Sequence, residues 1–232
     1  MLGKNNWYQD EDKAFAEAQV MEKPVFLYFC HDACIACKDI EMMIHQDHEL
    51  ADLIQNHFIG LRINQDMTVM IHRYKIDLVP TFIVAGTDGT EYERFADLIG
   101  HDDLAALCLF ALGKYCHDRN DTDAAQQYME KLVEIYPQSP YAPEAIFLRG
   151  VYRYLISENP AHLKTALFML GKNHPGSIWV RRSLVLHLHH SAVADWDNYR
   201  KQHRDYWKSQ EAYLKAYFTY HNGPSIHHLE TL

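Results

Sequence analysis

The chain has 232 residues, of which 48% are hydrophobic and 23% are charged. This composition is typical of a globular protein, and the length allows one large domain or two small ones. The formal net charge of -9 argues against a general nucleic-acid-binding protein. No apolar run approaches the roughly 20 residues of a membrane span, and the first residues lack the apolar core of a signal peptide. We therefore expect no membrane association and a cytoplasmic protein, or a periplasmic one if a signal peptide has been removed.

The first half of the chain alternates helical and strand patterns. Three short apolar runs, each separated from the next by a helical pattern, predict strands, and an Asp-Gly pair predicts a hairpin to a fourth strand. Crossovers through helices require parallel strands and a hairpin requires an antiparallel pair, so we expect a mixed sheet with helices on both faces. The predicted strands are 25–29, 58–63, 78–85 and 91–95, and the predicted helices are 7–20, 34–47, 51–56, 68–74 and 102–114.

Two cysteines, Cys34 and Cys37, stand where the first strand leads into a helix. The first N–H groups of a helix have no partner within the helix and carry partial positive charge, which stabilises a thiolate and lowers its pKa below the free value of about 8.5. Cys34 is the expected nucleophile and Cys37, one turn further on, the expected resolving thiol. A lone C-x-x-C also fits half a zinc site or an inert pair. Lys38, in place of a histidine, argues against haem attachment.

Several motifs of the first half together resemble the thioredoxin family, in particular thioredoxin-like proteins that begin with a Trp and an Ala-rich helix. The resemblance covers residues 5 to 115 and implies a thioredoxin-like α/β fold with a redox-active cysteine pair. In that family the proline corresponding to Pro80 is cis and faces the cysteines, and the backbone of the preceding residue, here Val79, pairs with the extended substrate chain. The motifs are Trp7, Ala14–Ala18, Lys23-Pro24, Val25–Phe29, Cys34–Lys38, Val79–Phe82 and Asp88-Gly89.

Three positions near the cysteines depart from the family pattern. Ala33 replaces the usual Trp before the first cysteine, and Ile35-Ala36 replaces a common Gly-Pro. The buried carboxylate that assists the resolving cysteine in thioredoxin corresponds to Tyr28, and a tyrosine with a pKa near 10 is a poor base at neutral pH. Asp32, Asp39 or a water molecule is left to take that role.

The other three cysteines are Cys30, Cys108 and Cys116. Cys30 is interpreted as a small buried hydrophobic residue, with a third redox thiol as the alternative. Cys108 falls among apolar residues of the last helix of the first half, and Cys116 falls at the end of that helix.

After Lys114 the composition changes and the pattern becomes helical. We predict a thioredoxin-like domain over 1–116 and an all-helical domain over 117–232. The helical domain is predicted to be tetratricopeptide-like, because Tyr136-Pro137 and His174-Pro175 form a loose repeat, each pair lying between two amphipathic helices. This second domain is either a docking groove for a partner protein or a cap that stabilises the first. The predicted helices are 124–136, 142–156, 162–170, 178–190 and 195–220.

Histidines gather in the second half at His187, His189, His190 and His227-His228. Because no carboxylate or cysteine stands at matching spacing, we predict no metal site there.

We therefore expect a thiol–disulfide oxidoreductase that exchanges Cys34 and Cys37 with protein disulfides and with a thiol reductant or oxidant, without a cofactor. Val79 and Pro80 would shape the substrate groove, and Lys38 would add positive potential beside the thiols. The alternative is a non-enzymatic adaptor that binds a partner through its helical domain. A thiol peroxidase has less support, because no distinct peroxidatic motif is present.

Overall fold

The computed structural model describes residues 7–64 and 68–188. Contacts along the chain divide it into a first unit that ends at Ala145 and a second that begins at Ile146. The sequence predicted a boundary between residues 116 and 117, and that domain assignment stays a prediction.

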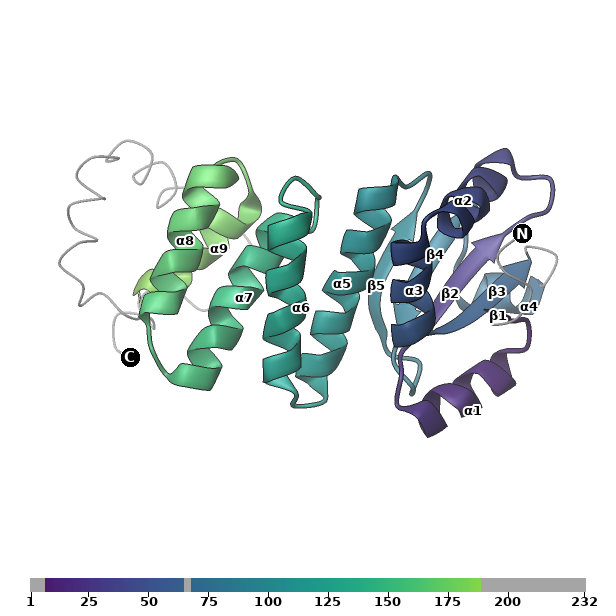
Figure 1. The fold of residues 1–232 in the computed structure, drawn as a ribbon, viewed down its shortest axis with the longest axis horizontal. Helices are drawn as coiled ribbons and strands as arrows, with labels where there is room; N and C mark the ends of the chain where they lie inside the picture. The colour runs from purple at the N-terminus through teal and green to yellow at the C-terminus, as the bar shows by residue number, and fades with distance from the viewer. Residues whose placement is uncertain (1–6, 65–67, 189–232) are drawn as a thin grey trace. The chain divides into compact units, whose positions relative to one another are not determined.

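The first unit is built on a five-stranded sheet with the order β1-β3-β2-β4-β5. β1, β3 and β2 run parallel, whereas β4 is antiparallel to both β2 and β5. The predicted mixed sheet is confirmed (Figure 1). The strands are β1 (Trp7–Tyr8), β2 (Val25–Cys30), β3 (Ile59–Asn64), β4 (Thr81–Ala85) and β5 (Glu91–Ala96).

Helices cover both faces of this sheet, and β2 shows why. Its six residues are all buried, and they alternate between two clusters. Phe26, Tyr28 and Cys30 pack with helices on one face, whereas Val25 and Phe29 pack with helices on the other. Since side chains of a strand point alternately to opposite faces, a continuous apolar run requires cover on both sides. The first face carries α2 (Ile35–Gln46), α3 (His48–His57) and α5 (His101–Asp118), and the second carries α1 (Glu11–Met21) and α4 (Thr68–Arg73) (Figure 1).

Several predicted elements are wrong in extent. The strand predicted over 78–85 begins at Thr81, after the cis proline. The helix predicted from Trp7 begins at Glu11, because the Asp10 side chain caps it by accepting a hydrogen bond from the Lys13 N–H at 3.1 Å. Trp7 instead pairs with Gly60 in the sheet. The short helix predicted over 51–56 is the ten-residue α3, whose start at His48 is capped by the preceding aspartate.

α5 is longer than predicted and continues beyond residue 114 to Asp118, across the predicted domain boundary. It is followed within the first unit by α6 (Thr122–Ile135), which the Asp121 side chain caps. The two helices approach closely at Gly113, where an added Cβ would lie 2.4 Å from the Met129 side chain. A helix of the sheet domain and a helix predicted to belong to the next domain therefore share one core.

The second unit is helical in its described part, which confirms the predicted helical region. α7 (Ala142–Ser157) spans the boundary, and α8 (Ala161–Asn173) and α9 (Ile178–Leu188) follow. Gly150 packs against Ala166, and the Phe147 and Trp179 rings lie 5.0 Å apart. The tetratricopeptide likeness stays a prediction, and the last predicted helix, 195–220, lies outside the described residues.

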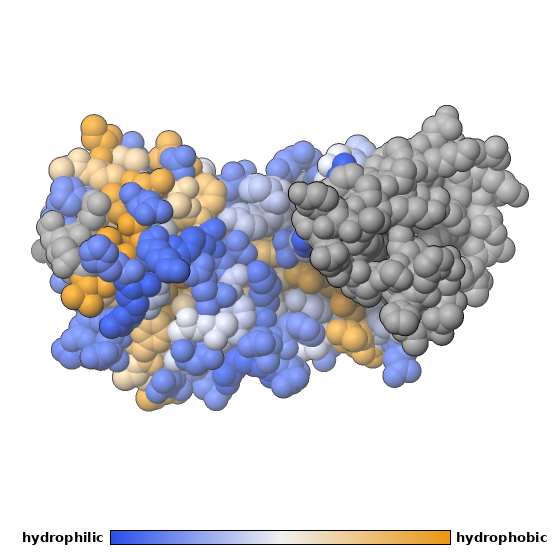
Figure 2. All heavy atoms as spheres, turned by 180° about the vertical axis from the view of Figure 1, so that it is seen from behind, coloured by the Kyte–Doolittle hydropathy of each residue, from blue (hydrophilic) through white to orange (hydrophobic). Residues whose placement is uncertain are grey.

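In the view of Figure 2, apolar side chains are exposed between hydrophilic ones. Over the described part of the chain, none of the helices has the length and apolar character needed to cross a membrane.

Candidate functional site

Cys34 and Cys37 form a disulfide at the end of the first unit's central strand. Their Cα atoms lie 5.3 Å apart, within the usual range for a disulfide. β2 ends at Cys30 and α2 begins at Ile35, so the short loop between them delivers Cys34 to the start of the helix. The predicted strand–cysteine pair–helix arrangement is the observed one.

The two sulfurs have different surroundings. Cys34 is the N-cap residue of α2, and its Sγ accepts a hydrogen bond from the Cys37 N–H at 3.0 Å. It is half-buried, whereas Cys37 is only 2% exposed. A thiolate at Cys34 would keep that hydrogen bond and the partial positive charge of the helix end, which suits a reactive nucleophile. A disulfide arriving from solvent therefore meets Cys34 more readily than Cys37.

The loop that precedes β4 lies against the cysteine pair. The Val79–Pro80 peptide bond is cis, as the resemblance implies. Cys34 Sγ lies 3.9 Å from the Val79 carbonyl oxygen. The loop is fixed by two hydrogen bonds, from Thr81 Oγ1 to the Leu78 carbonyl at 2.7 Å and from the Asp97 N–H to the Pro80 carbonyl at 3.1 Å. Residues 45 positions apart in the sequence are thereby brought together at one site.

Tyr28 lies beneath the pair, fully buried in β2. Its hydroxyl donates a hydrogen bond to the Cys37 carbonyl at 3.1 Å, and its ring stacks on Phe82 at 5.1 Å between centroids. Burial raises the pKa of Tyr28 far above its usual value, with smaller contributions from Cys30 and Glu41. The tyrosine therefore anchors the first turn of α2 and cannot serve as a base at neutral pH.

A cluster of three charged residues, which was not predicted from the sequence, connects the loop before Cys34 with the part of α2 that follows Cys37. Arg62 of β3 donates from Nε to Glu41 of α2 at 3.1 Å and from a terminal guanidinium nitrogen to Asp32 at 3.2 Å. The side chain of Glu41 is 15% exposed and that of Asp32 is 76% exposed. Arg62 is the register partner of Tyr28 in the neighbouring strand, which places the cluster beside the site.

Two residues next to the cysteines, expected to support the site, lie at the surface: Lys38, predicted to add positive potential, and Ala33, which replaces the family's Trp. Ala33 and Lys38 are both exposed. The Ala33 N–H donates to His31 Nδ1 at 3.2 Å, a contact that shapes the loop before Cys34. The influence of Lys38 on the thiols stays a prediction.

The remaining cysteines lie in the interior or partly so. Cys30 and Cys108 are fully buried and Cys116 is half-buried. Burial raises the pKa of Cys30 to about 12 and that of Cys116 to about 11, and it raises that of Cys108 further. Cys30 Sγ also donates to the Ile63 carbonyl at 3.6 Å. These surroundings favour the interpretation of Cys30 as a packing residue.

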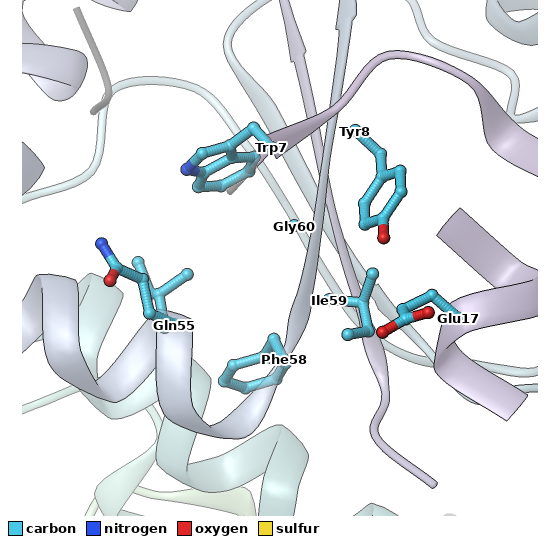
Figure 3. Close-up of a pocket in the computed structure, with 8 residues that line it drawn as sticks. Trp7, Tyr8, Glu17, Gln55, Phe58, Ile59 and Gly60 are labelled. Carbon is cyan, nitrogen blue, oxygen red and sulfur yellow. The ribbon is translucent and has the colours of Figure 1, made fainter. Parts of the chain in front are cut away.

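A separate pocket of about 410 Å³ opens at the β1 edge of the sheet and contains neither cysteine (Figure 3). The rings of Trp7 and Tyr8 form its upper wall in Figure 3, and Phe58 lies opposite. Trp7 lies so close over Gly60 that an added Cβ would be 2.9 Å from the indole. A larger residue at this position would therefore force the indole to move, and the indole packs edge-on against Phe26 and Tyr28.

Within residues 7–64 and 68–188, the structure brings no three metal-ligating side chains together. His189, His190 and His227-His228 lie outside the described residues, as does the side chain of His187.

Comparison with known proteins places the first unit in a class. Residues 6–85 match the model of a thioredoxin-like family. With the mixed sheet, the flanking helices and the cysteine pair at the start of α2, this match identifies the N-terminal region as a thioredoxin-like domain. No curated protein matches the sequence.

Solved structures similar to the chain include three bacterial proteins. A thioredoxin from Thermus thermophilus is 24% identical, over 39% of this chain and 73% of that one, with a TM-score of 0.35. The oxidised C-terminal domain of DsbD from Neisseria meningitidis is 20% identical, over 41% and 90% of the two chains, with a TM-score of 0.36. A thioredoxin-fold protein from Helicobacter pylori is 17% identical, over 54% and 99%, with a TM-score of 0.40.

Proposed function

We propose that the protein is a thiol–disulfide oxidoreductase that acts on protein disulfides through Cys34 and Cys37. The observation that carries this proposal is the placement of a half-buried sulfur at the N-cap of α2, 3.0 Å from the N–H of its own disulfide partner. Exchange through such a pair needs a thiolate, a resolving thiol and access, and no organic cofactor. A thiol reductant or oxidant returns the pair to its starting state.

The reaction proceeds by two exchanges. In the reduced protein the Cys34 thiolate attacks one sulfur of the substrate disulfide, and the other sulfur leaves as a thiolate. Cys37 then attacks Cys34 in the resulting mixed disulfide, which re-forms the pair seen in the structure and releases the reduced substrate. The greater exposure of Cys34 decides the order, because an incoming disulfide must reach the first sulfur from solvent.

Backbone and apolar groups beside Cys34 support an extended protein segment as the substrate. Val79 presents its carbonyl to Cys34, and within the described residues its N–H has no backbone partner. An extended chain could therefore pair with Val79 as an added strand does. Three apolar side chains near this loop and the start of α2 are exposed and would contact the flanking residues of such a segment. They are Ile35, Leu78 and Leu98.

The test is turnover of a protein disulfide by the full-length chain, with Cys34→Ser as the inactive comparison. We expect the wild type to reduce insulin disulfides at the expense of dithiothreitol and the variant to give only the uncatalysed rate. Cys116→Ser is the matched control, because it removes a half-buried thiol elsewhere in the unit. Equal rates for the wild type and Cys34→Ser would refute the proposal.

The adaptor alternative predicts a different result. A partner that binds through the helical region should be retained whatever the oxidation state of Cys34, and Cys34→Ser should leave its binding unchanged. A partner trapped covalently by Cys37→Ser, which cannot resolve a mixed disulfide, would instead support exchange chemistry.

A further inference from the structure

We propose that Asp97 gives the protein a preference for disulfides flanked by lysine or arginine. The inference rests on the proposed function and adds a substrate class to it, since nothing in that function uses Asp97. The chemistry remains the two exchanges at Cys34 and Cys37, and Asp97 changes only how readily a substrate reaches Cys34.

Asp97 lies directly after β5, beside the loop that carries Val79. Ala96, the last residue of β5, is opposite the first residue of β4 in the sheet. One position further on, the Asp97 N–H donates a hydrogen bond to the Pro80 carbonyl at 3.1 Å. Pro80 follows Val79, whose carbonyl oxygen lies 3.9 Å from Cys34 Sγ. Asp97 is therefore fixed next to the place where an extended substrate would pair.

The backbone of Asp97 has a conformation that favours glycine. Its φ angle is 133°, a value that L residues rarely adopt and that glycine adopts freely. Backbone strain of this kind is concentrated at functional sites, where the surrounding structure holds it in place. Here the hydrogen bond to Pro80 does so, together with the Leu98 N–H, which donates to Asp97 Oδ1 at 2.6 Å. An aspartate where glycine would be easier to accommodate points to a task for the carboxylate.

The negative charge of Asp97 is available to a substrate. The residue is exposed, and within residues 7–64 and 68–188 its Oδ2 has no hydrogen-bond partner and no basic side chain pairs with it. Arg94, three residues earlier in β5, is instead bound to Glu91 through two nitrogens, at 2.8 and 2.6 Å. The carboxylate of Asp97 is thus not neutralised by an ion pair in this part of the chain.

A basic side chain beside the reacting cysteine of a substrate would be attracted to this carboxylate. Charges interact over about 8 Å at physiological ionic strength, and Asp97 contacts the residue next to Val79. Lysine and arginine also have long apolar stems that pack on apolar surface while the charged end stays in water. Leu98, which follows Asp97 and is 60% exposed, offers such a surface. An acidic side chain at the same place would be repelled.

Exposed charges of both signs lie in the segments around the pairing loop and the cysteines, 31–39 and 75–79. Lys38 would attract an acidic substrate and therefore opposes Asp97. The other exposed charges are three aspartates and one lysine, so negative charge predominates. They are Asp32, Asp39, Asp77 and Lys75. The sign of the substrate preference shows whether Asp97 or Lys38 decides it.

The test compares three synthetic peptide disulfides with the reduced full-length protein. Each is the symmetric disulfide of a short acetylated and amidated peptide, with lysine, glutamine or glutamate on both sides of its one cysteine. Release of the peptide thiol is followed by acid quenching and chromatography, and each rate is divided by that with dithiothreitol to correct for the peptide's own reactivity. At low ionic strength we expect the wild type to reduce the lysine peptide at least about fivefold faster than the glutamate peptide.

Substitutions assign this ratio to Asp97. Asp97→Asn should lower the ratio at least about threefold and Asp97→Lys should invert it, whereas the rate for the glutamine peptide should stay within about twofold. Asp97→Gly suits the φ angle of 133° and should lower the ratio as Asp97→Asn does, even if the larger substitutions do not fold. Asp123→Asn is the matched control, because it removes an exposed charge from the first turn of α6 and should leave the ratio unchanged.

Salt separates charge from shape. At an ionic strength of about 0.5 M the wild-type ratio should fall to within about twofold of one, whereas a preference due to packing alone would persist and overturn the proposal. A wild type that prefers the glutamate peptide or neither peptide overturns it, as does a ratio that survives in Asp97→Gly or falls equally in Asp123→Asn. The proposed function fails separately, if no peptide is reduced faster than by Cys34→Ser.

Discussion

The first unit places the same side chain in two kinds of surroundings. At the start of α2, Cys34 is partly exposed and forms a disulfide, and its Sγ accepts a hydrogen bond from the Cys37 N–H, one of the first N–H groups of the helix. In the interior of β2 and α5, Cys30 and Cys108 meet apolar neighbours and no solvent. Burial raises the pKa of the interior thiols, whereas a helix N-terminus lowers that of a thiol placed there. The surroundings that favour a reactive thiol at Cys34 therefore come from its backbone position and exposure. Cys30, only four residues earlier in the chain, has surroundings that disfavour a thiolate.

Thiol labelling gives the largest expected contrast between these regions. In the reduced native protein near pH 7, iodoacetamide should modify Cys34 at least about a hundredfold faster than Cys30 or Cys116, since a thiol with a pKa near 11 is thiolate in only about one molecule in ten thousand. Peptide mass analysis of timed samples measures the ratio, with unfolded protein as the control. Comparable rates for Cys34 and Cys116 would remove the distinction.

Serine substitutions sharpen the comparison through stability. Cys108→Ser places a hydroxyl in a fully buried site and should lower the free energy of unfolding by about 1–3 kcal/mol. Cys34→Ser should change that of the reduced protein by less than about 0.5 kcal/mol, because serine is a favoured N-cap residue. Denaturant unfolding under reducing conditions provides both values. A larger loss at Cys34 than at Cys108 would contradict the assignment of the interior.

Alkaline pH should act on the interior thiols. The folded-state pKa of Cys30 is about 12 and that of Cys116 about 11, against 9.0 for an unperturbed thiol. Above about pH 9 the unfolded chain loses these protons and the folded chain keeps them, so stability falls as pH rises from about 9 to about 12. The midpoint of urea unfolding, followed in Cys34→Ser/Cys37→Ser protein, should decline over that window. Replacing Cys30 by alanine should reduce the decline, and an unchanged slope would count against its burial.

The smallest effect is expected at the contact between the two regions. Tyr28→Phe removes the hydrogen bond from the phenol to the Cys37 carbonyl and should cost about 1 kcal/mol of stability. The rate at which iodoacetamide labels Cys34 should stay within about twofold, because the N–H that faces Cys34 Sγ is retained. A large loss of labelling would show that the tyrosine controls the thiol directly.

Local pattern was sufficient for most of the fold and for the cysteine pair. Alternation, apolar runs and the Asp-Gly hairpin predicted every strand except β1, whose two residues are too few to show a period. Trp7 joins the sheet only because Gly60 leaves room for its indole, a contact that no local pattern reports. Pro80 and Val79 were reached through the family resemblance, and the structure places Val79 3.9 Å from Cys34.

The charged cluster could not be predicted in the same way. Arg62 meets Glu41 and Asp32 across 21 and 30 residues of sequence. That meeting depends on the register that sets Arg62 opposite Tyr28 and on the rotation of α2 over the sheet. A one-residue change in register would turn Arg62 to the other face. The one available signal was a lone arginine in an otherwise apolar strand, and a strand's exposed position explains such a residue equally well.

The length of α5 has a practical consequence for dividing the protein. Beyond residue 116 the helix still supplies Asp118, which accepts a hydrogen bond from the Tyr92 hydroxyl at 2.6 Å, and it is followed by Arg119, which pairs with Glu22 at 3.3 Å. A fragment that stopped at Cys116 would lose both tethers to the sheet and to α1. It would also expose the side of α5 on which Met129 packs. An autonomous fragment is better sought by cutting beyond Tyr141, because the ring of Tyr141 still packs on Phe110 of α5, with 5.4 Å between the ring centroids.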